Sequence, residues 1–405
     1  MRRGLRRTLL VATVLTVTGG IVSLAVIGSS YSRAASLVVR AAGLGGRYPR
    51  IASWYRQAVS ESPLTIPSRH GPIAARLYRP TGGYPAAVLL VPGINALGVE
   101  EPRLSAFARA ISETGLLVVT AAMPDMTRYL VTARTTDTIE DAALWMAARR
   151  DLAPGGRIGM AGISFAGGLS IVAAGRPALR DRVTFVFAFG PHASFPQVLR
   201  FFCTGIVPLP PWAPERNLRP GVRRVEGGVW RKPHDYGAAV VALDLADRLV
   251  PPEQLAPLRR AILEFLAASH IWINDPEAAE ARFETARRLG RELPEPASAI
   301  MREVNDRDVE ALGARLLPLL GGAVQASSLS PIESPAPRAP VYILHGIDDN
   351  LVPPEETLLL EHYLAGKTRT RVLMTDLMDH AELGHQPTLS EAWTIVSLIA
   401  GMLRE

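Results

Sequence analysis

The sequence predicts an α/β fold in which a mostly parallel sheet is flanked by helices and carries a large helical insertion. Three observations lead to this class. In the first half of the chain, short apolar runs typical of buried strands alternate with amphipathic helical patterns. The alternation stops from residue 196 to residue 334, where no clear buried strand occurs, and it then resumes. Such alternation implies right-handed crossovers and neighbouring strands that run in one direction.

The first part of the fold is expected to comprise residues 62–195. It opens with two short strands around the turn His70-Gly71, a pattern that predicts a hairpin. The run AAVLLVPG follows, and its continuous apolar character is typical of a strand buried on both faces. The later elements of this part are expected to be helix 104–114, strand 116–123, helix 138–151, strand 157–164, helix 165–175 and strand 183–190.

Residues 196–334 are expected to form a helical cap that is inserted into the main fold. A proline-rich loop lies near its start, and a second proline-rich connector ends it. Its helical patterns cover 240–250, 255–268, 276–289 and 309–320. Residues 335–405 are expected to complete the main fold with strand 340–346, helix 353–366, strand 371–376 and helix 390–403.

The composition is typical of a globular protein. Of the 405 residues, 48% are hydrophobic and 20% are charged, which argues against a disordered chain. The net charge is +6, but beyond the N-terminus the basic residues are scattered, so we expect no nucleic-acid partner. The single cysteine, Cys203, excludes an intrachain disulfide and any CxxC motif, and we expect it to be a small buried residue.

Residues 1–34 have the pattern of a membrane anchor. Arginines precede a long apolar stretch, and no charged residue occurs from Thr8 to Ser32. A helix needs about 20 apolar residues to span a bilayer, and flanking arginines favour the cytoplasm. We therefore expect the rest of the chain on the extracytoplasmic side, behind a juxtamembrane segment at 35–61. A cleaved signal peptide, which would leave a secreted protein, and a helix of the main domain are the alternatives.

Ser164 lies in the stretch RIGMAGISFAGGLS, where an expected strand ends and an expected helix begins. This is the setting in which a G-x-S-x-G turn presents a nucleophilic serine. Gly162 and Gly167 supply the small residues that such a strained turn needs. The strict motif would have glycine where Ala166 stands, so the match is close but incomplete. A structural turn with an incidental serine is the alternative.

A serine hydroxyl needs a base, usually histidine, and a carboxylate that orients the base. The last two expected strands are followed by Asp349 and by His380, so that Ser164, Asp349 and His380 all follow strand ends. In parallel sheets, sites form at that edge. Asp348 is the alternative acid, and His385 is the alternative base.

The other parts of such a site are backbone donors and a pocket wall. Stabilising an oxyanion takes two N–H groups, one from the residue after the nucleophile, Phe165, and one from the loop after an earlier strand. Ile94 is the expected second donor, and Asn95 is the alternative. His192 follows a strand and is a candidate for the pocket wall, whereas His345 is expected to be structural.

The segments LLVPGIN, GISFAGG, LHGIDDNLVP and DLMDHAE resemble those of α/β-hydrolases, and more narrowly of dienelactone-hydrolase-like and esterase-like members. The resemblance covers residues 62–195 and 335–405. Dienelactone hydrolases proper use a cysteine nucleophile, whereas the serine of this chain leans toward carboxylic esters. Pro92-Gly93 stands where the family usually shows His-Gly.

The resemblance implies a serine hydrolase that cleaves a carboxylic ester or thioester through Ser164, His380 and Asp349, with an acyl-enzyme intermediate. It implies a small-molecule ester substrate, no metal and no cofactor, and a cap that shapes the pockets. Two alternatives stay open. One is a membrane-anchored binding protein on this fold that lacks activity, because fold does not fix function. The other is a serine peptidase of the same fold.

Overall fold

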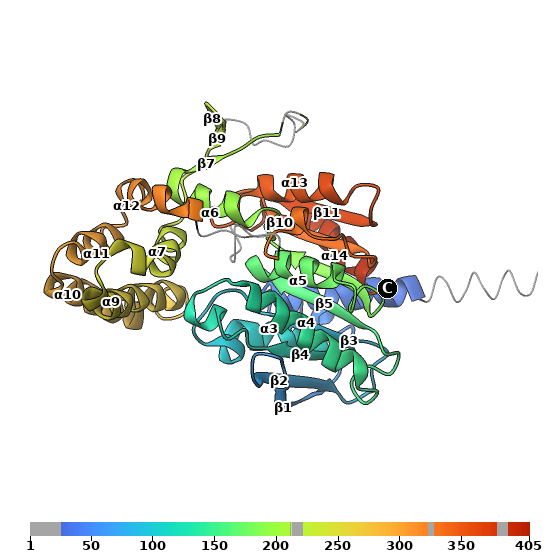
Figure 1. Cartoon of the computed structure of the whole chain (residues 1–405). Coiled ribbons are helices and arrows are strands. Elements are labelled where there is room, and N and C mark those ends of the chain that lie inside the picture. Colours follow the sequence, from blue (N-terminus) through green and yellow to red (C-terminus); the bar gives the residue numbers. More distant parts are fainter. Residues whose placement is uncertain (1–25, 211, 213–221, 323–327, 379–387) are drawn as a thin grey trace, which may run out of the picture.

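A computed structural model of the chain describes residues 26–210, 212, 222–322, 328–378 and 388–405. Within these residues the main sheet has eight strands in the order β1-β2-β4-β3-β5-β6-β10-β11 (Figure 1). β2 pairs antiparallel with both of its neighbours, and every other neighbouring pair is parallel. The strands are β1 (Val59–Ile66), β2 (Ile73–Pro80), β3 (Ala87–Val91), β4 (Leu117–Ala121), β5 (Ile158–Ile163), β6 (Val183–Phe189), β10 (Val341–Gly346) and β11 (Thr370–Thr375).

This strand order, with its antiparallel second strand and crossover between β3 and β4, is that of the α/β-hydrolase fold. The predicted fold class is therefore confirmed. The central strands β3 and β4 are apolar except for Thr120, as is typical of a sheet covered on both faces, and every residue of both strands is buried.

Helices cover the two faces of the sheet in separate groups. Side chains of α4 (Ala133–Ala148), α5 (Phe165–Gly175) and α13 (Pro354–Leu364) pack with one face in the larger hydrophobic core. On the other face, a second core joins α3 (Pro102–Ser112), α14 (Leu389–Met402) and a helix at 26–41. Alternate residues of each strand face one core or the other, as Leu89 and Leu90 of β3 do.

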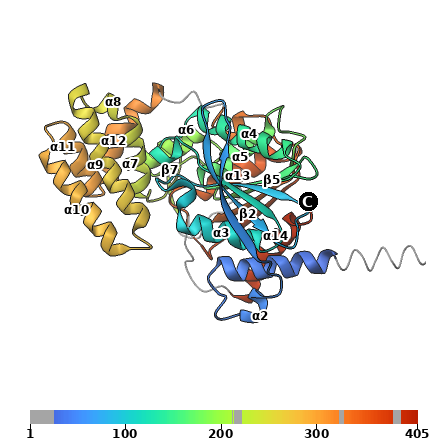
Figure 2. The same ribbon diagram turned by 90° about the horizontal axis from the view of Figure 1, so that it is seen from below.

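The helix at 26–41 packs onto the main domain (Figure 2). Ala34 is fully buried in a small cluster with two residues of α14. Arg40 forms an ion pair with Glu113 at 2.9 Å, and the Arg33 guanidinium donates to the Thr114 carbonyl at 2.7 Å. Among the helices that the structure describes, none has the length and apolar character needed to cross a bilayer. Residues 1–25 of the expected anchor lie outside the described residues.

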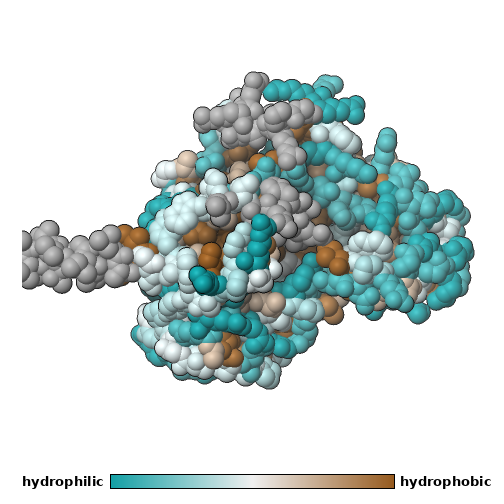
Figure 3. All heavy atoms as spheres, turned by 180° about the vertical axis from the view of Figure 1, so that it is seen from behind, coloured by the Kyte–Doolittle hydropathy of each residue, from teal (hydrophilic) through white to brown (hydrophobic). Residues whose placement is uncertain are grey.

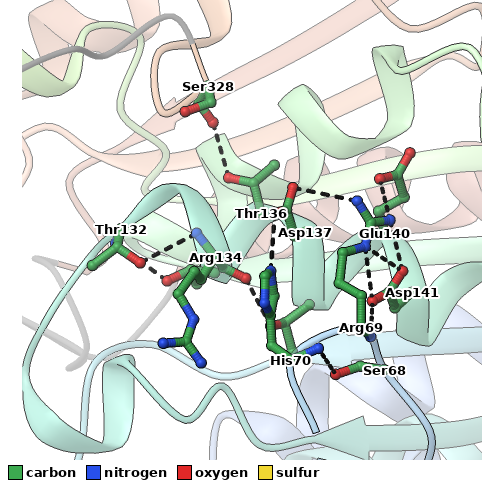
Figure 4. Close-up of polar contacts among 12 residues, drawn as sticks. Ser68, Arg69, His70, Thr132, Arg134, Thr136, Asp137, Glu140, Asp141 and Ser328 are labelled. Atoms are coloured by element: carbon green, nitrogen blue, oxygen red, sulfur yellow. Dashed lines mark hydrogen bonds and ion pairs between the residues drawn. The ribbon is translucent and has the colours of Figure 1, made fainter.

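A network of charged side chains ties the β1–β2 hairpin to α4 (Figure 4). Arg69 in the hairpin turn contacts Asp141 at 2.7 Å and Glu140 at 2.8 Å, and the His70 ring lies 3.1 Å from Asp137. Burial opposes ionisation of Asp137, but hydrogen bonds from His70 and Arg176 lower the pKa of its carboxyl. The network therefore attaches the two strands at this edge of the sheet to α4. Among the described strands, β1, as the edge strand, pairs with a neighbour on one side only.

The insertion between β6 and β10 forms a helical cap beyond one end of the sheet (Figures 1 and 2). Its outer surface is mainly hydrophilic in the view of Figure 3, because its apolar side chains point into the protein core. A short sheet, β7 (Ile206–Val207), β9 (Gly228–Trp230) and β8 (Arg223–Val225), precedes most of the helices. The cap helices are α6 (Phe195–Thr204), α7 (Asp235–Asp244), α8 (Ala246–Leu249), α9 (Pro252–Ile271), α10 (Pro276–Glu292), α11 (Ala297–Asn305) and α12 (Val309–Leu316).

Candidate active site

Ser164 occupies a strained turn between β5 and α5. It is the N-cap residue of α5 and has φ 58° and ψ −131°, a backbone conformation that residues with a side chain rarely adopt. Hydrogen bonds on both sides fix the turn: the Ser164 N–H donates to the Phe189 carbonyl at 2.7 Å, and the Gly167 N–H donates to the Ser164 carbonyl at 2.8 Å. Such strain is typical of functional sites, where surrounding structure holds a residue in one orientation.

Glycines around Ser164 are required by close approach of the backbone. A Cβ atom at Gly162 would lie 2.3 Å from the Ala166 carbonyl oxygen, and one at Gly168 would lie 2.5 Å from the His192 ring. At Gly167 the contacts would be wider, from 3.1 Å. Ala166 is fully buried without a comparable conflict, so the departure from the strict motif at this position is accommodated.

The loop after β3 lies beside the serine. A Cβ atom at Gly93 would be 3.7 Å from the Ser164 Cβ. The buried side chain of Asn95 braces this loop, since its amide donates to the Gly93 carbonyl at 3.1 Å and its oxygen accepts from the Gly98 N–H at 2.7 Å. Ile94, between these residues, lines the same cavity as Ser164. The loop therefore has the position that an oxyanion-binding loop requires.

Phe165 is the first residue of α5. The first N–H groups of a helix have no acceptor within the helix, and they lie at its positive end. The Phe165 N–H is therefore suited to stabilise negative charge that develops next to Ser164. Together, Ile94 and Phe165 flank the serine from two different segments of the chain.

Asp349 is buried in the loop after β10, with 1% of its surface exposed, whereas the neighbouring Asp348 is exposed. One carboxylate oxygen of Asp349 accepts from the Leu351 N–H at 2.9 Å and from the Val352 N–H at 2.8 Å. Its other oxygen lies 3.3 Å from the His345 ring. These contacts hold the carboxylate at the carboxyl edge of the sheet.

The two histidines considered as the base, His380 and His385, lie outside the described residues. Of the histidines that the structure describes, two were considered from the sequence, His345 and His192. The His345 ring is buried between the Val352 carbonyl at 2.9 Å and the Thr357 hydroxyl at 2.6 Å, as expected for a structural residue.

His192 was a candidate for the pocket wall, and the structure places it elsewhere. It is fully buried behind α5, its ring donates to the Leu329 carbonyl at 2.7 Å, and burial lowers its pKa to about 4. It is not among the described residues that line the cavity. The reason is that Gly168 lets α5 approach the ring closely.

A cavity of about 690 Å³ opens at Ser164, and the cap supplies part of its wall. Tyr236 and His234 reach it from α7 and its N-cap, and His270 reaches it from the end of α9. Burial lowers the pKa of His270. Sequence reasoning missed these three residues as site components. The apolar stretch around α9 serves two roles, since Phe265 packs in the core while His270 and its neighbours face the cavity.

α7 is bonded to loops on both sides of the serine. The Tyr236 hydroxyl donates to the Ile94 carbonyl at 3.2 Å, and the His234 N–H donates to the Asn350 carbonyl at 3.0 Å. Burial raises the pKa of Tyr236 well above its usual value, so the hydroxyl stays a donor. The cap therefore touches the loop after β3 and the loop that carries Asp349.

An ion pair and two backbone hydrogen bonds also attach the cap to α13 of the main domain. The Arg231 guanidinium contacts both carboxylate oxygens of the buried Glu355 on α13, at 2.8–3.1 Å. The neighbouring Glu356 is also buried and accepts the N–H groups of Ala193 and Ser194 at 2.8 and 2.7 Å. Burial outweighs these bonds and raises the pKa of Glu356 to about 7. α13 is therefore bonded to the cap at two places, through Glu356 at its start and through Glu355 further along the chain.

The described part of the site combines a serine in a strained turn, two flanking backbone segments and a buried carboxylate at the same edge of the sheet, which are the parts that acyl transfer uses beside a base. Metal ligation has no support among the described residues, which contain no group of three or more suitable side chains.

No family model matches the chain, and no curated protein is significantly similar to it in sequence. Similar solved structures include an esterase from Pyrobaculum calidifontis (18% identity, 92% of this chain, 90% of that chain, TM-score 0.44). A dienelactone hydrolase from Anabaena variabilis is 12% identical over 85% of this chain and 97% of its own, with a TM-score of 0.40. An acylaminoacyl peptidase from Pyrococcus horikoshii is 12% identical over 88% of this chain and 43% of its own, with a TM-score of 0.44. Likeness this distant assigns no activity to the chain.

Proposed function

We propose that the chain is a serine hydrolase that cleaves carboxylic esters or thioesters. The observation that carries this proposal is the conformation of Ser164, held at φ 58° on the wall of a large cavity between two segments with available backbone donors. A turn with an incidental serine would need neither the strain nor the cavity. The glycines that permit the turn are those that the nucleophile of an α/β-hydrolase needs.

The proposed reaction begins with attack of the Ser164 hydroxyl oxygen on the ester carbonyl carbon. His380 takes the hydroxyl proton, and Asp349 orients the ring and stabilises its positive charge. The N–H groups of Phe165 and Ile94 stabilise the oxyanion, and losing one such donor typically costs about 3–4 kcal/mol in the transition state. The bond to the leaving oxygen or sulfur then breaks, and His380 returns the proton to it. Water attacks the acyl-enzyme by the same route and releases the carboxylic acid.

A fluorophosphonate probe tests the proposal directly, because it labels only an activated serine. Wild type should be labelled and should hydrolyse p-nitrophenyl butyrate, whereas Ser164→Ala should do neither. Loss of the nucleophile should lower turnover by about 10⁴–10⁶-fold. Ser170→Ala on the same helix is the matched control and should be labelled like wild type.

If folded wild type is not labelled and hydrolyses no ester, the proposal fails and a binding protein on this fold becomes the better interpretation. Circular dichroism and a thermal melt of each variant show whether the protein is folded. His380→Ala and His385→Ala, assayed side by side, decide which histidine is the base. Only the variant that lacks the true base should lose labelling.

We also propose that the N-terminal apolar stretch that begins at residue 8 holds the enzyme at a membrane, with the cavity on the extracytoplasmic side. The support is the uncharged apolar stretch behind the N-terminal arginines. Membrane fractionation of the full chain tests this. The protein should stay in the pellet after a carbonate wash and should be accessible to protease from the outside. Recovery in the soluble fraction would refute it.

A further inference from the structure

The cavity at Ser164 has a second part that lies against one face of the sheet. Strand residues alternate between faces, and apart from Gly162 the strand residues that line the cavity belong to one face, among them Leu90 of β3, Ala161 and Ile163 of β5, and Phe185, Phe187 and Phe189 of β6. We call this part the sheet arm, and the part lined by α7 and α9 the cap arm. Ile163 directly precedes Ser164, so the sheet arm begins next to the serine.

Three helices form the opposite wall of the sheet arm: α3, α14 and the helix at 26–41. Ala110 and Ala392 contribute to this wall, and their short side chains leave space that larger residues would fill. Two charged residues of these helices line the cavity: Arg40, which pairs with Glu113 at 2.9 Å, and Arg103 of α3, which pairs with Glu101 at 2.9 Å. The other residues with which the three helices line the cavity are apolar.

The cap arm has a different chemistry. His234, Tyr236, Ser269 and His270 bring hydroxyl and imidazole groups to its wall. An ester cleaved at Ser164 has two halves, and the two arms offer them unlike surroundings. An aliphatic chain gains free energy when it leaves water for a carbon-lined space, whereas polar groups lose it there unless they form hydrogen bonds.

We propose that the sheet arm receives the acyl chain of the substrate and that the substrate class is esters of medium-chain fatty acids. This inference rests on the proposed function. From Phe189 to Phe185 the sheet arm follows β6 for about 13 Å, the length of an extended chain of about ten carbons. When Ser164 attacks, the carbonyl carbon becomes bonded to its oxygen with the chain in the sheet arm. The alcohol leaves with the proton through the cap arm, and water later releases the fatty acid.

Two variants that narrow the sheet arm test the proposal. Ala392→Trp places a large side chain on the α14 wall at a half-buried position, and Ala161→Leu fills the strand face further from Ser164. Thr394→Trp is the matched control, because Thr394 is an exposed residue of the same helix that does not line the cavity. The measurement is kcat/KM for p-nitrophenyl butyrate and laurate, each below its solubility limit.

The laurate-to-butyrate ratio of kcat/KM should fall at least tenfold in Ala392→Trp and Ala161→Leu, and it should equal the wild-type ratio in Thr394→Trp. If Ser164-dependent butyrate hydrolysis is present but the ratio is the same in all four proteins, the sheet arm does not hold the chain, while the proposed function stands. If no Ser164-dependent hydrolysis of either ester occurs, the proposed function itself fails.

A binding measurement tests the sheet arm without catalysis. The Ser164→Ala protein is titrated with dansyl-undecanoic acid, and dansyl fluorescence is followed. Saturable binding is expected, with affinity at least tenfold weaker when Ala392→Trp is added and unaltered when Thr394→Trp is added. Equal affinity in all three proteins, or no binding in folded Ser164→Ala, would overturn the inference.

Discussion

Replacement of Gly162 by alanine tests whether the turn at Ser164 must keep its shape for activity. The new Cβ would lie 2.3 Å from the Ala166 carbonyl oxygen and 2.7 Å from the Gly167 nitrogen. Both contacts are to backbone of the first turn of α5, so no flexible side chain can move aside. Ordinary contact begins near 3.4 Å, and the carbonyl would have to retreat by about 1 Å.

The displaced segment includes Phe165, whose N–H is a proposed oxyanion donor. A displacement of about 1 Å can cost about 100-fold in rate, and overpacking of this kind typically costs about 1–3 kcal/mol of stability. We expect Gly162→Ala to fold and to lose about 100-fold in kcat/KM for p-nitrophenyl butyrate. Fluorophosphonate labelling should slow by a similar factor.

Gly155→Ala is the matched control, since nothing lies within 4 Å of its Cβ position. This substitution, three residues before β5, should leave both the rate and the melting temperature close to those of wild type. Activity of Gly162→Ala within twofold of wild type, in a protein that melts normally, would refute the reasoning. The close approach of Ala166 would then have no bearing on the reacting serine.

Two further predictions concern the cap and its attachment. Tyr236→Phe removes the hydrogen bond to the Ile94 carbonyl, whose loss costs about 1–3 kcal/mol because the acceptor is buried. The variant should therefore lower kcat for the butyrate ester about tenfold, with little effect on KM. Tyr363→Phe, on α13, is the control, and equal kcat in the two variants would contradict this prediction. The pKa of Glu356 is about 7 in the folded protein against its ordinary 4.5, so wild type should lose up to about 3 kcal/mol of stability as pH rises from 4.5 through 7, whereas Glu356→Gln should not. Urea unfolding at pH 5 and pH 8 measures this, and parallel pH dependence in the two proteins would contradict it.

The sequence predicted those parts of the fold that depend on local pattern. β3 is apolar throughout and β4 is apolar except for Thr120, and such runs are unambiguous when they alternate with amphipathic helices. Ser164 was found because its glycines are neighbours in the chain. The short strands β7 to β9 escaped prediction, since two or three residues carry no periodicity.

Contacts between distant segments could not be predicted from local pattern. Tyr236 and Ile94 are 142 residues apart, and neither segment contains a sequence pattern that predicts the hydrogen bond between them. His192 was a candidate for the pocket wall because it follows a strand, but the close approach of α5 at Gly168 buries it. The helix at 26–41 reads as a continuation of an apolar N-terminus, whereas Ala34 packs in a cluster with α14.

The attachment of α7 at two points has a consequence for how this protein can change over evolutionary time. The helix that shapes the cap arm also positions the backbone of Ile94 through Tyr236 and the Asp349 loop through His234. A mutation in α7 that widens the cap arm for a new leaving group therefore also shifts the Ile94 backbone and the Asp349 loop, on which the rate depends. Selectivity and rate are not independent traits here, and a laboratory search for new substrates should start from the walls of the sheet arm, which α7 does not form.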